Sequence, residues 1–170
     1  KLPGLTPLLA MLIATKGFPV AMHGTPTEDR RVFTSEVLEA LGIHAQSTSV
    51  QLKPGKVAFV PTENLHIGLK RLLDVRRVVG LRNPAHSLVK LLLPCEGKQL
   101  LITNYTHPEY AESMAHVLCA MNTTAMLLRG TEGEPVADAR RQPKMSSIAK
   151  GTVLDVLEHQ SGALHTLPDL

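Results

Sequence analysis

The positions of hydrophobic and polar residues divide the chain into short apolar runs and longer segments with a helical repeat. Apolar runs bounded by turn residues predict buried strands at 18–22, 57–60, 99–104 and 124–130. Apolar residues three and four apart predict helices at 5–16, 34–42, 62–79, 86–93, 107–121 and 151–160, and a long polar loop is expected at 131–147. Because the strands are apolar without clean alternation and are separated by helices, we expect an α/β fold with a mostly parallel central sheet flanked by helices.

Local signals at the ends of the expected helices support these boundaries. Thr34 and Thr62 are suitable N-caps for the helices that follow them. Gly80 is suited to end the helix that begins near Thr62, because glycine readily adopts the left-handed conformation found after a helix. We therefore expect one continuous helix from Thr62 to Val79.

Composition places the chain among globular proteins. Its 170 residues are 44% hydrophobic and 19% charged, which is typical of a folded domain and not of a disordered segment. This length suits a single α/β domain spanning residues 1–170. With three Phe, two Tyr and no Trp, the chain has few rings on which nucleic-acid bases could stack.

Cysteine usage and hydropathy indicate where the protein works. Cys95 and Cys119 are far apart and lack metal-ligand spacing, which suggests reduced thiols and a cytoplasmic location. The eight His residues also show no metal spacing, so no metal site is expected. No apolar run reaches the length of a membrane span, so we expect no membrane partner.

Positive charge is concentrated in one short part of the chain. Between Lys70 and Lys90 six Lys or Arg residues stand against one acid, Asp74, which leaves this segment at +5 while the whole chain is only +3. Helical spacing would leave Lys70, Arg71 and Arg77 facing solvent. A second row with four-residue spacing follows, formed by Arg82, His86 and Lys90. Two neighbouring cationic rows form a stripe that suits a phosphate backbone.

The segment MHGTPTEDRRVFTSEVLEALGI (22–43) resembles anthranilate phosphoribosyltransferases, where a lysine-HGNR motif and a serine-rich loop precede ADVLEALG. LLDVRRVVGLR (72–82) and LRGTEG (128–133) also resemble segments of that family, and the resemblance covers nearly the whole chain. It implies the family's α/β fold. Catalysis is not implied, because the family's HGNR asparagine and arginine fall on Thr25 and Pro26.

Further departures affect the phosphate and metal sites of that family. Its two phosphate-loop serines fall on Asp29 and Arg30, and its lysine falls on Arg31. The acidic pair that holds magnesium would fall near Pro135 and Val136, which have no side-chain oxygen. We therefore expect no catalytic residue and no cofactor.

GLRNPAHSLVKLL (80–92) and RGTEGEPVADARRQP (129–143) look like the non-enzymatic YbiB-type branch of this superfamily. The resemblance implies binding of nucleic acid and, in the full-length protein, an N-terminal helical domain that forms a homodimer. We expect the present chain to be a fragment without that helical domain and without the C-terminal end. The expected partner is single-stranded DNA or RNA, and the expected binding residues are Lys70, Arg71, Arg77, Arg82, His86, Lys90, Arg30 and Arg31.

Several alternatives remain open from the sequence. The retained His23-Gly24 and Arg82 allow a transferase that uses Mg²⁺ and phosphoribosyl pyrophosphate. The basic face could instead dock an acidic protein, or be a solvated helix surface with no partner. Arg82 has Asp74 available as an ion-pair partner, and His86 could hydrogen-bond within the core.

Overall fold

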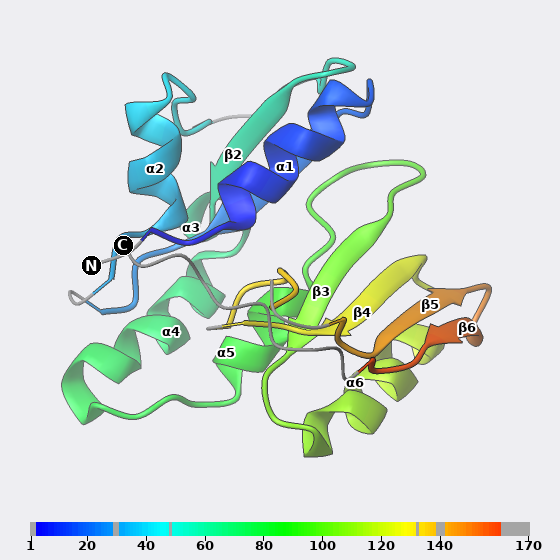
Figure 1. Ribbon diagram of the computed structural model, residues 1–170. Helices are drawn as coiled ribbons and strands as arrows, with labels where there is room; N and C mark the ends of the chain where they lie inside the picture. The colour runs from blue at the N-terminus through cyan, green and yellow to red at the C-terminus, as the bar shows by residue number, and fades with distance from the viewer. Residues whose placement is uncertain (1–2, 29–30, 48, 132, 139–141, 161–170) are drawn as a thin grey trace, which may run out of the picture. The chain divides into compact units, whose positions relative to one another are not determined.

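The computed structural model describes residues 3–28, 31–47, 49–131, 133–138 and 142–160 (Figure 1). Contacts divide the chain into two compact units, residues 1–95 and 96–170. Each unit contains a sheet with at least one helix packed on it, so the expected α/β class is confirmed.

In the first unit, a parallel pair of strands carries two helices. Its elements are α1 (Thr6–Thr15), β1 (Val20–Gly24), α2 (Thr34–Ala40), β2 (Val57–Pro61), α3 (Thr62–Leu65), α4 (Ile67–Val79), α5 (Ala85–Leu88) and the 3-10 helix η1 (Val89–Leu91). Met22 of β1 lies opposite Phe59 of β2, and both are buried in one cluster with Ala10 of α1 and Leu38 of α2. The hydrophobic residues of α1 and α2 therefore meet the sheet, as their spacing predicts.

In the second unit, the sheet is mixed. Its elements are β3 (Leu101–Tyr105), α6 (Glu109–Ala120), β4 (Ala125–Arg129), β5 (Met145–Ala149) and β6 (Thr152–Leu157). The strand order is β3-β4-β5-β6, in which β3 and β4 are parallel and the two later pairings are antiparallel. Three side chains of this unit are at most 2% exposed, namely Leu118 of α6, Leu127 of β4 and Ile148 of β5.

Two expectations for the end of the chain are wrong. The expected helix at 151–160 is the strand β6, and the expected loop at 131–147 ends earlier because β5 begins at Met145. Lys150 and Gly151 join β5 to β6 with φ values of 51° and 73°. This two-residue turn with positive φ at both positions is the connection that favours a β-hairpin. Val153 and Leu154, whose spacing with Leu157 suggested a helix, are exposed side chains of β6.

The expected helix from Thr62 to Val79 is broken at one residue. His66 is extended, with φ −158° and ψ 96°, and it separates α3 from α4. Its Nδ1 accepts a hydrogen bond of 3.0 Å from the backbone N–H of Leu69, so His66 caps α4. Gly80 ends α4 in the left-handed conformation, as expected.

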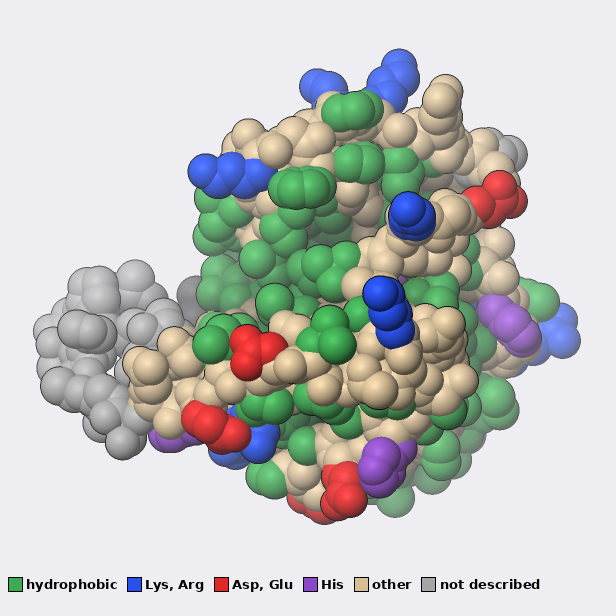
Figure 2. All heavy atoms as spheres, turned by 90° about the vertical axis from the view of Figure 1, so that its right-hand side faces the viewer, with side chains coloured by type: hydrophobic (Ala, Val, Ile, Leu, Met, Phe, Trp, Pro, Cys, Tyr) green, Lys and Arg blue, Asp and Glu red, His purple; other side chains and the backbone are tan. Residues whose placement is uncertain are grey.

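Hydrophobic side chains reach the surface in many places, as the face in Figure 2 shows. At the end of α4, Val78 is 89% exposed and Leu81 is 70% exposed. The cationic side chains of α4 are therefore interspersed with apolar surface.

Candidate nucleic-acid interface

Helix α4 is held by one apolar face and carries cations on the others. Leu69 and Leu73 are buried against Ala85 of α5, with Val89 and Leu92 packed beside them. Burying a Leu side chain stabilises a fold by about 1.5–3 kcal/mol, so this contact fixes the direction of the charged faces.

Lys70 does not extend freely from α4. Its Nζ forms an ion pair with Asp74 Oδ2 one helical turn later, and its side chain is only 21% exposed. Arg71, on the next position, is exposed. The positive charge of Lys70 is therefore balanced at close range, which reduces what it adds to the surface potential.

The segment that follows β1 is docked on α4 by arginines. Arg76 Nη2 donates to Glu28 Oε2 at 2.5 Å, and Arg76 Nη1 donates to Thr27 Oγ1 at 3.3 Å. Arg31 Nε lies 3.0 Å from Glu28 Oε1, so one carboxylate joins two guanidinium groups. Arg77 Nη2 donates to the carbonyl oxygen of Pro26 at 3.4 Å. Position 76 was not among the expected binding residues, and nothing in the sequence links it to a residue 48 positions earlier.

Asn83 fixes the connection between α4 and α5. Its Nδ2 donates to the carbonyl oxygen of Leu72 at 2.6 Å, and its Oδ1 accepts from the backbone N–H of Ala85 at 3.0 Å. His86 Nδ1 lies 3.2 Å from the carbonyl oxygen of Asn83. These contacts fix the start of α5 and hold the His86 ring beside the Asn83 backbone.

Arg82, His86 and Lys90, which we call the 82–90 cluster, influence one another electrostatically. Burial lowers the pKa of His86; the hydrogen bond with the Asn83 backbone opposes this, and the charges of Arg76, Arg82 and Lys90 lower the pKa further. Burial and then the charge of Arg82 lower the pKa of Lys90 to about 8. His86 Nε2 is buried and has no hydrogen-bond partner among the described residues. The cluster is thus a place where positive charge is crowded.

The structure places seven of the eight expected binding residues. Arg71, Arg77 and Arg82 are exposed, while Lys70, His86 and Lys90 are half-buried. Arg31 is exposed and is paired with Glu28. Arg30 lies outside the described residues. The residues that sequence reasoning missed are Arg76, Glu28 and Asn83, which act through non-local contacts or through backbone hydrogen bonds.

A second polar region lies at the carboxyl ends of β1 and β2. Gly24 pairs with Pro61 in the sheet, and Thr25 and Thr62 follow them directly. The Oγ1 atoms of both threonines and Nδ1 of His23 are buried without a hydrogen-bond partner among the described residues. Burial lowers the pKa of His23, so its neutral form is favoured. In parallel α/β sheets this edge is where ligands bind.

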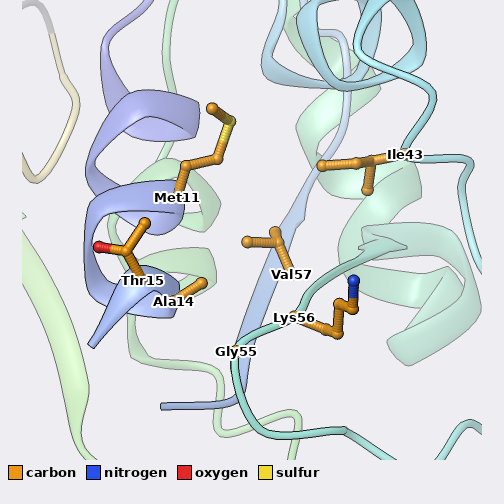
Figure 3. Close-up of a pocket in the computed structure, with 7 residues that line it drawn as sticks. All are labelled: Met11, Ala14, Thr15, Ile43, Gly55, Lys56 and Val57. Atoms are coloured by element: carbon orange, nitrogen blue, oxygen red, sulfur yellow. The ribbon is translucent and has the colours of Figure 1, made fainter. Parts of the chain in front are cut away.

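The opposite end of β2 has an apolar hollow. A cavity of about 320 Å³ opens between α1 and the turn before β2, as Figure 3 shows. Its lining is Met11, Ala14, Thr15, Ile43, Gly55, Lys56 and Val57. It lacks a cluster of polar groups of the kind found at the carboxyl ends of the strands.

The described residues offer no site for a metal ion. No group of three or more His, Cys, Asp or Glu side chains is placed to hold a metal in the parts of the chain that the structure covers. Pro135 and Val136 are both described and have no side-chain oxygen. Within the described residues, no helix has the length and hydropathy needed to cross a membrane.

Comparison with known proteins places the chain in a family. The profile described as "Glycosyl transferase family, a/b domain" matches residues 4–161. The chain is 34% identical over 168 residues to the uncharacterized protein YbiB of Escherichia coli K12. The aligned segment covers 96% of this chain and 52% of YbiB.

Anthranilate phosphoribosyltransferases are also similar. The enzyme from Symbiobacterium thermophilum is 32% identical, over 73% of this chain and 38% of the enzyme. The enzyme from Synechocystis is 28% identical, over 94% of this chain and 47% of the enzyme. The chain therefore spans about half, or less, of the length of these relatives. It belongs to the glycosyl transferase family of a/b domains, on the branch that includes YbiB.

Proposed function

We propose that the protein binds single-stranded DNA or RNA without sequence preference, through α4 and the 82–90 cluster, on a fold that has lost transferase activity. The observation that carries this proposal is the half-buried ammonium of Lys90, whose pKa is lowered to about 8 by burial and then by the charge of Arg82. A phosphate placed among these groups would relieve their repulsion and accept hydrogen bonds from them. An anionic polymer supplies such phosphates at regular spacing.

The composition of this surface favours phosphate contacts over base contacts. Residues 67–95 contain no Phe, Tyr or Trp. Stacking on aromatic rings is the usual source of base affinity in single-strand binders, so little sequence preference is expected. Phosphate contacts fix position on the strand but do not carry sequence information.

The loss of transferase activity rests on the residues that replace the family's catalytic groups. Pro26 stands in place of the arginine, and its carbonyl oxygen is hydrogen-bonded to Arg77. By the family resemblance, the acidic pair that holds magnesium would fall near Pro135 and Val136, which have no side-chain oxygen. The proposal includes a homodimer, which the family resemblance supports, and a cytoplasmic location, which is supported by Cys95 and Cys119 not being joined in a disulfide.

The salt dependence of binding tests this proposal directly. Labelled single-stranded oligonucleotides of random and homopolymer sequence are titrated with the full-length protein at several salt concentrations. If about six phosphates are engaged, the logarithm of the affinity should fall against the logarithm of salt with a slope of roughly −4. Absence of binding, or a slope near zero, would contradict the proposal. Retention of an acidic protein with no oligonucleotide binding would favour a protein-docking surface.

One observation supports a second candidate, a phosphoribosyltransferase with an altered substrate. The unpartnered polar atoms of His23, Thr25 and Thr62 lie where this fold binds ligands. Calorimetric titration with phosphoribosyl pyrophosphate and Mg²⁺ decides between the two. Tight binding that requires the metal would favour the transferase, and no heat of binding would favour the nucleic-acid proposal.

A further inference from the structure

The Glu28 carboxylate holds two arginines that come from different parts of the first unit. Its Oε1 lies 3.0 Å from Nε of Arg31, and its Oε2 accepts from Nη2 of Arg76 at 2.5 Å. The Arg76 side chain is 18% exposed and the Glu28 side chain is 23% exposed. This ion pair is therefore partly shielded from solvent, and it is stronger than an ordinary surface pair.

Two guanidinium groups arranged around one carboxylate can also hold a phosphate. Guanidinium N–H groups match the oxygens of carboxylates and phosphates with the same fork geometry. The two Glu28 oxygens thus stand where two phosphodiester oxygens would be bound. The charge of Arg76 also contributes to lowering the pKa of His86, so this pair acts electrostatically on the 82–90 cluster.

We infer that Arg31 and Arg76 form a phosphate-binding site for a nucleic-acid backbone, and that Glu28 occupies this site in the unbound protein. A phosphodiester group displaces the Glu28 carboxylate and takes its hydrogen bonds from both arginines. Binding therefore competes with an internal anion, which weakens attachment of short or isolated phosphates and favours long strands that also engage the 82–90 cluster. This inference rests on the proposed function.

The contacts around Glu28 show how the displacement can occur without unfolding α4. The docked segment is held by Thr27 and Pro26 through hydrogen bonds of 3.3 and 3.4 Å, longer than the typical N–H···O distance. α4 itself is anchored by Leu69 and Leu73 on its other face. Release of Glu28 therefore changes the loop after β1 and leaves the helix in place.

The test replaces the internal anion with a neutral isostere. In Glu28→Gln the affinity for a short labelled oligodeoxythymidine should rise by about fivefold, the order that one partly shielded ion pair contributes. Glu39→Gln is the matched control, because the Glu39 carboxylate also contacts a basic side chain, with Oε1 2.8 Å from Nδ1 of His44, and its loss changes the net charge equally. An equal rise in both variants, or a fall in Glu28→Gln, would overturn the inference.

A double-mutant cycle identifies the site that Glu28 occupies. Arg31→Gln/Arg76→Gln, treated as one arm of the cycle, should weaken binding, and in that background Glu28→Gln should give no gain beyond the control substitution. A gain that persists without both arginines would overturn the inference. If neither the native protein nor any of the variants binds the oligonucleotide, the proposed function itself fails.

A measurement on the native protein covers the case in which Glu28→Gln fails to fold. Side-chain NMR signals of Arg76 Nε and of the Glu28 carboxyl carbon are followed during titration with the same oligonucleotide. Both should shift together along the titration. Binding with an unchanged Glu28 signal would overturn the inference.

Discussion

Two cationic regions of the first unit have similar charge in the sequence, and the structure places different groups around them. On α4, Lys70 is paired with Asp74 and Arg76 with Glu28. In the 82–90 cluster, burial and then the charge of Arg82 lower the pKa of Lys90 to about 8. A count of Lys and Arg therefore does not give the surface potential, because the position of the acids decides it.

The difference follows from which side chains lie beside the cations of each region. Asp74 lies one helical turn from Lys70 on the same helix, and the segment after β1 brings Glu28 to Arg76. The 82–90 cluster is positioned by Asn83, whose side chain is used in hydrogen bonds with the backbone. The side chain of Asn83, which positions this cluster, is itself neutral.

The largest expected effect is a loss of affinity for single-stranded DNA when charge is removed from the 82–90 cluster, compared with charge removal on α4. In Arg82→Gln/Lys90→Gln the affinity for single-stranded DNA should fall by about 100-fold at low salt, since two crowded phosphate contacts are lost. Lys70→Gln should reduce the affinity by only about twofold, because Asp74 already balances that charge. Fluorescence anisotropy with a labelled oligonucleotide measures both.

The control for the double variant removes two exposed lysines elsewhere in the same unit. Lys16→Gln/Lys53→Gln changes the net charge by the same amount. Its affinity should change by less than about threefold, as expected for charges outside the contact surface. Equal losses in the two double variants would mean that net charge, and not the 82–90 cluster, governs binding.

Much of the fold could be predicted from the sequence because its signals are local. α1, α6 and the first four strands follow apolar periodicity and turn residues. The strand β6 was missed because Val153, Leu154 and Leu157 have helical spacing, although Lys150-Gly151 is a hairpin turn.

The candidate site was harder to predict, because its main contacts join residues far apart in the chain. The cationic residues themselves were visible as a charge run. Their pairing was not, since the hydrogen bond between Arg76 and Glu28 spans 48 positions. The Lys70–Asp74 pair follows the i,i+4 rule and could have been predicted from spacing alone.

The pH dependence of binding sharpens the comparison, because it reports on the 82–90 cluster. A bound phosphate would raise the pKa of Lys90, which burial and the charge of Arg82 lower to about 8 in the free protein. Below pH 8 Lys90 is charged in both states; above it, binding must take up a proton. The affinity should therefore fall by about tenfold as pH rises from about 7.5 to 9.5. Lys90→Arg, which stays charged, should show a flat profile over this range; an unchanged slope would contradict the assignment.

The stability of the fold gives a smaller effect at the same residue. Because the pKa of Lys90 is lower in the folded protein than its ordinary value of 10.5, keeping it charged costs folding free energy at neutral pH. Lys90→Met should raise the free energy of unfolding at pH 7 by about 1 kcal/mol, less than the full shift implies because Lys90 keeps some contact with solvent. The gain should shrink as pH rises from 8 towards 10.5. Chemical denaturation measures it, and Lys98→Met, at an exposed lysine, should give no such gain.

The smallest expected effect is a gain in affinity when the acid that pairs with Lys70 on α4 is removed. Asp74→Asn removes the carboxylate that pairs with Lys70, so the Lys70 ammonium becomes available to a phosphate. Because one partly exposed ion pair is lost, the affinity for single-stranded DNA should rise by about two- to threefold. Asp155→Asn is the matched control: it makes the same change on β6, where the carboxylate accepts a hydrogen bond from the N–H of Val156. If both variants bind equally well, the Asp74 carboxylate does not restrain Lys70. If Asp74→Asn gains affinity and Lys70→Gln abolishes that gain, the local acid is what separates the two cationic regions.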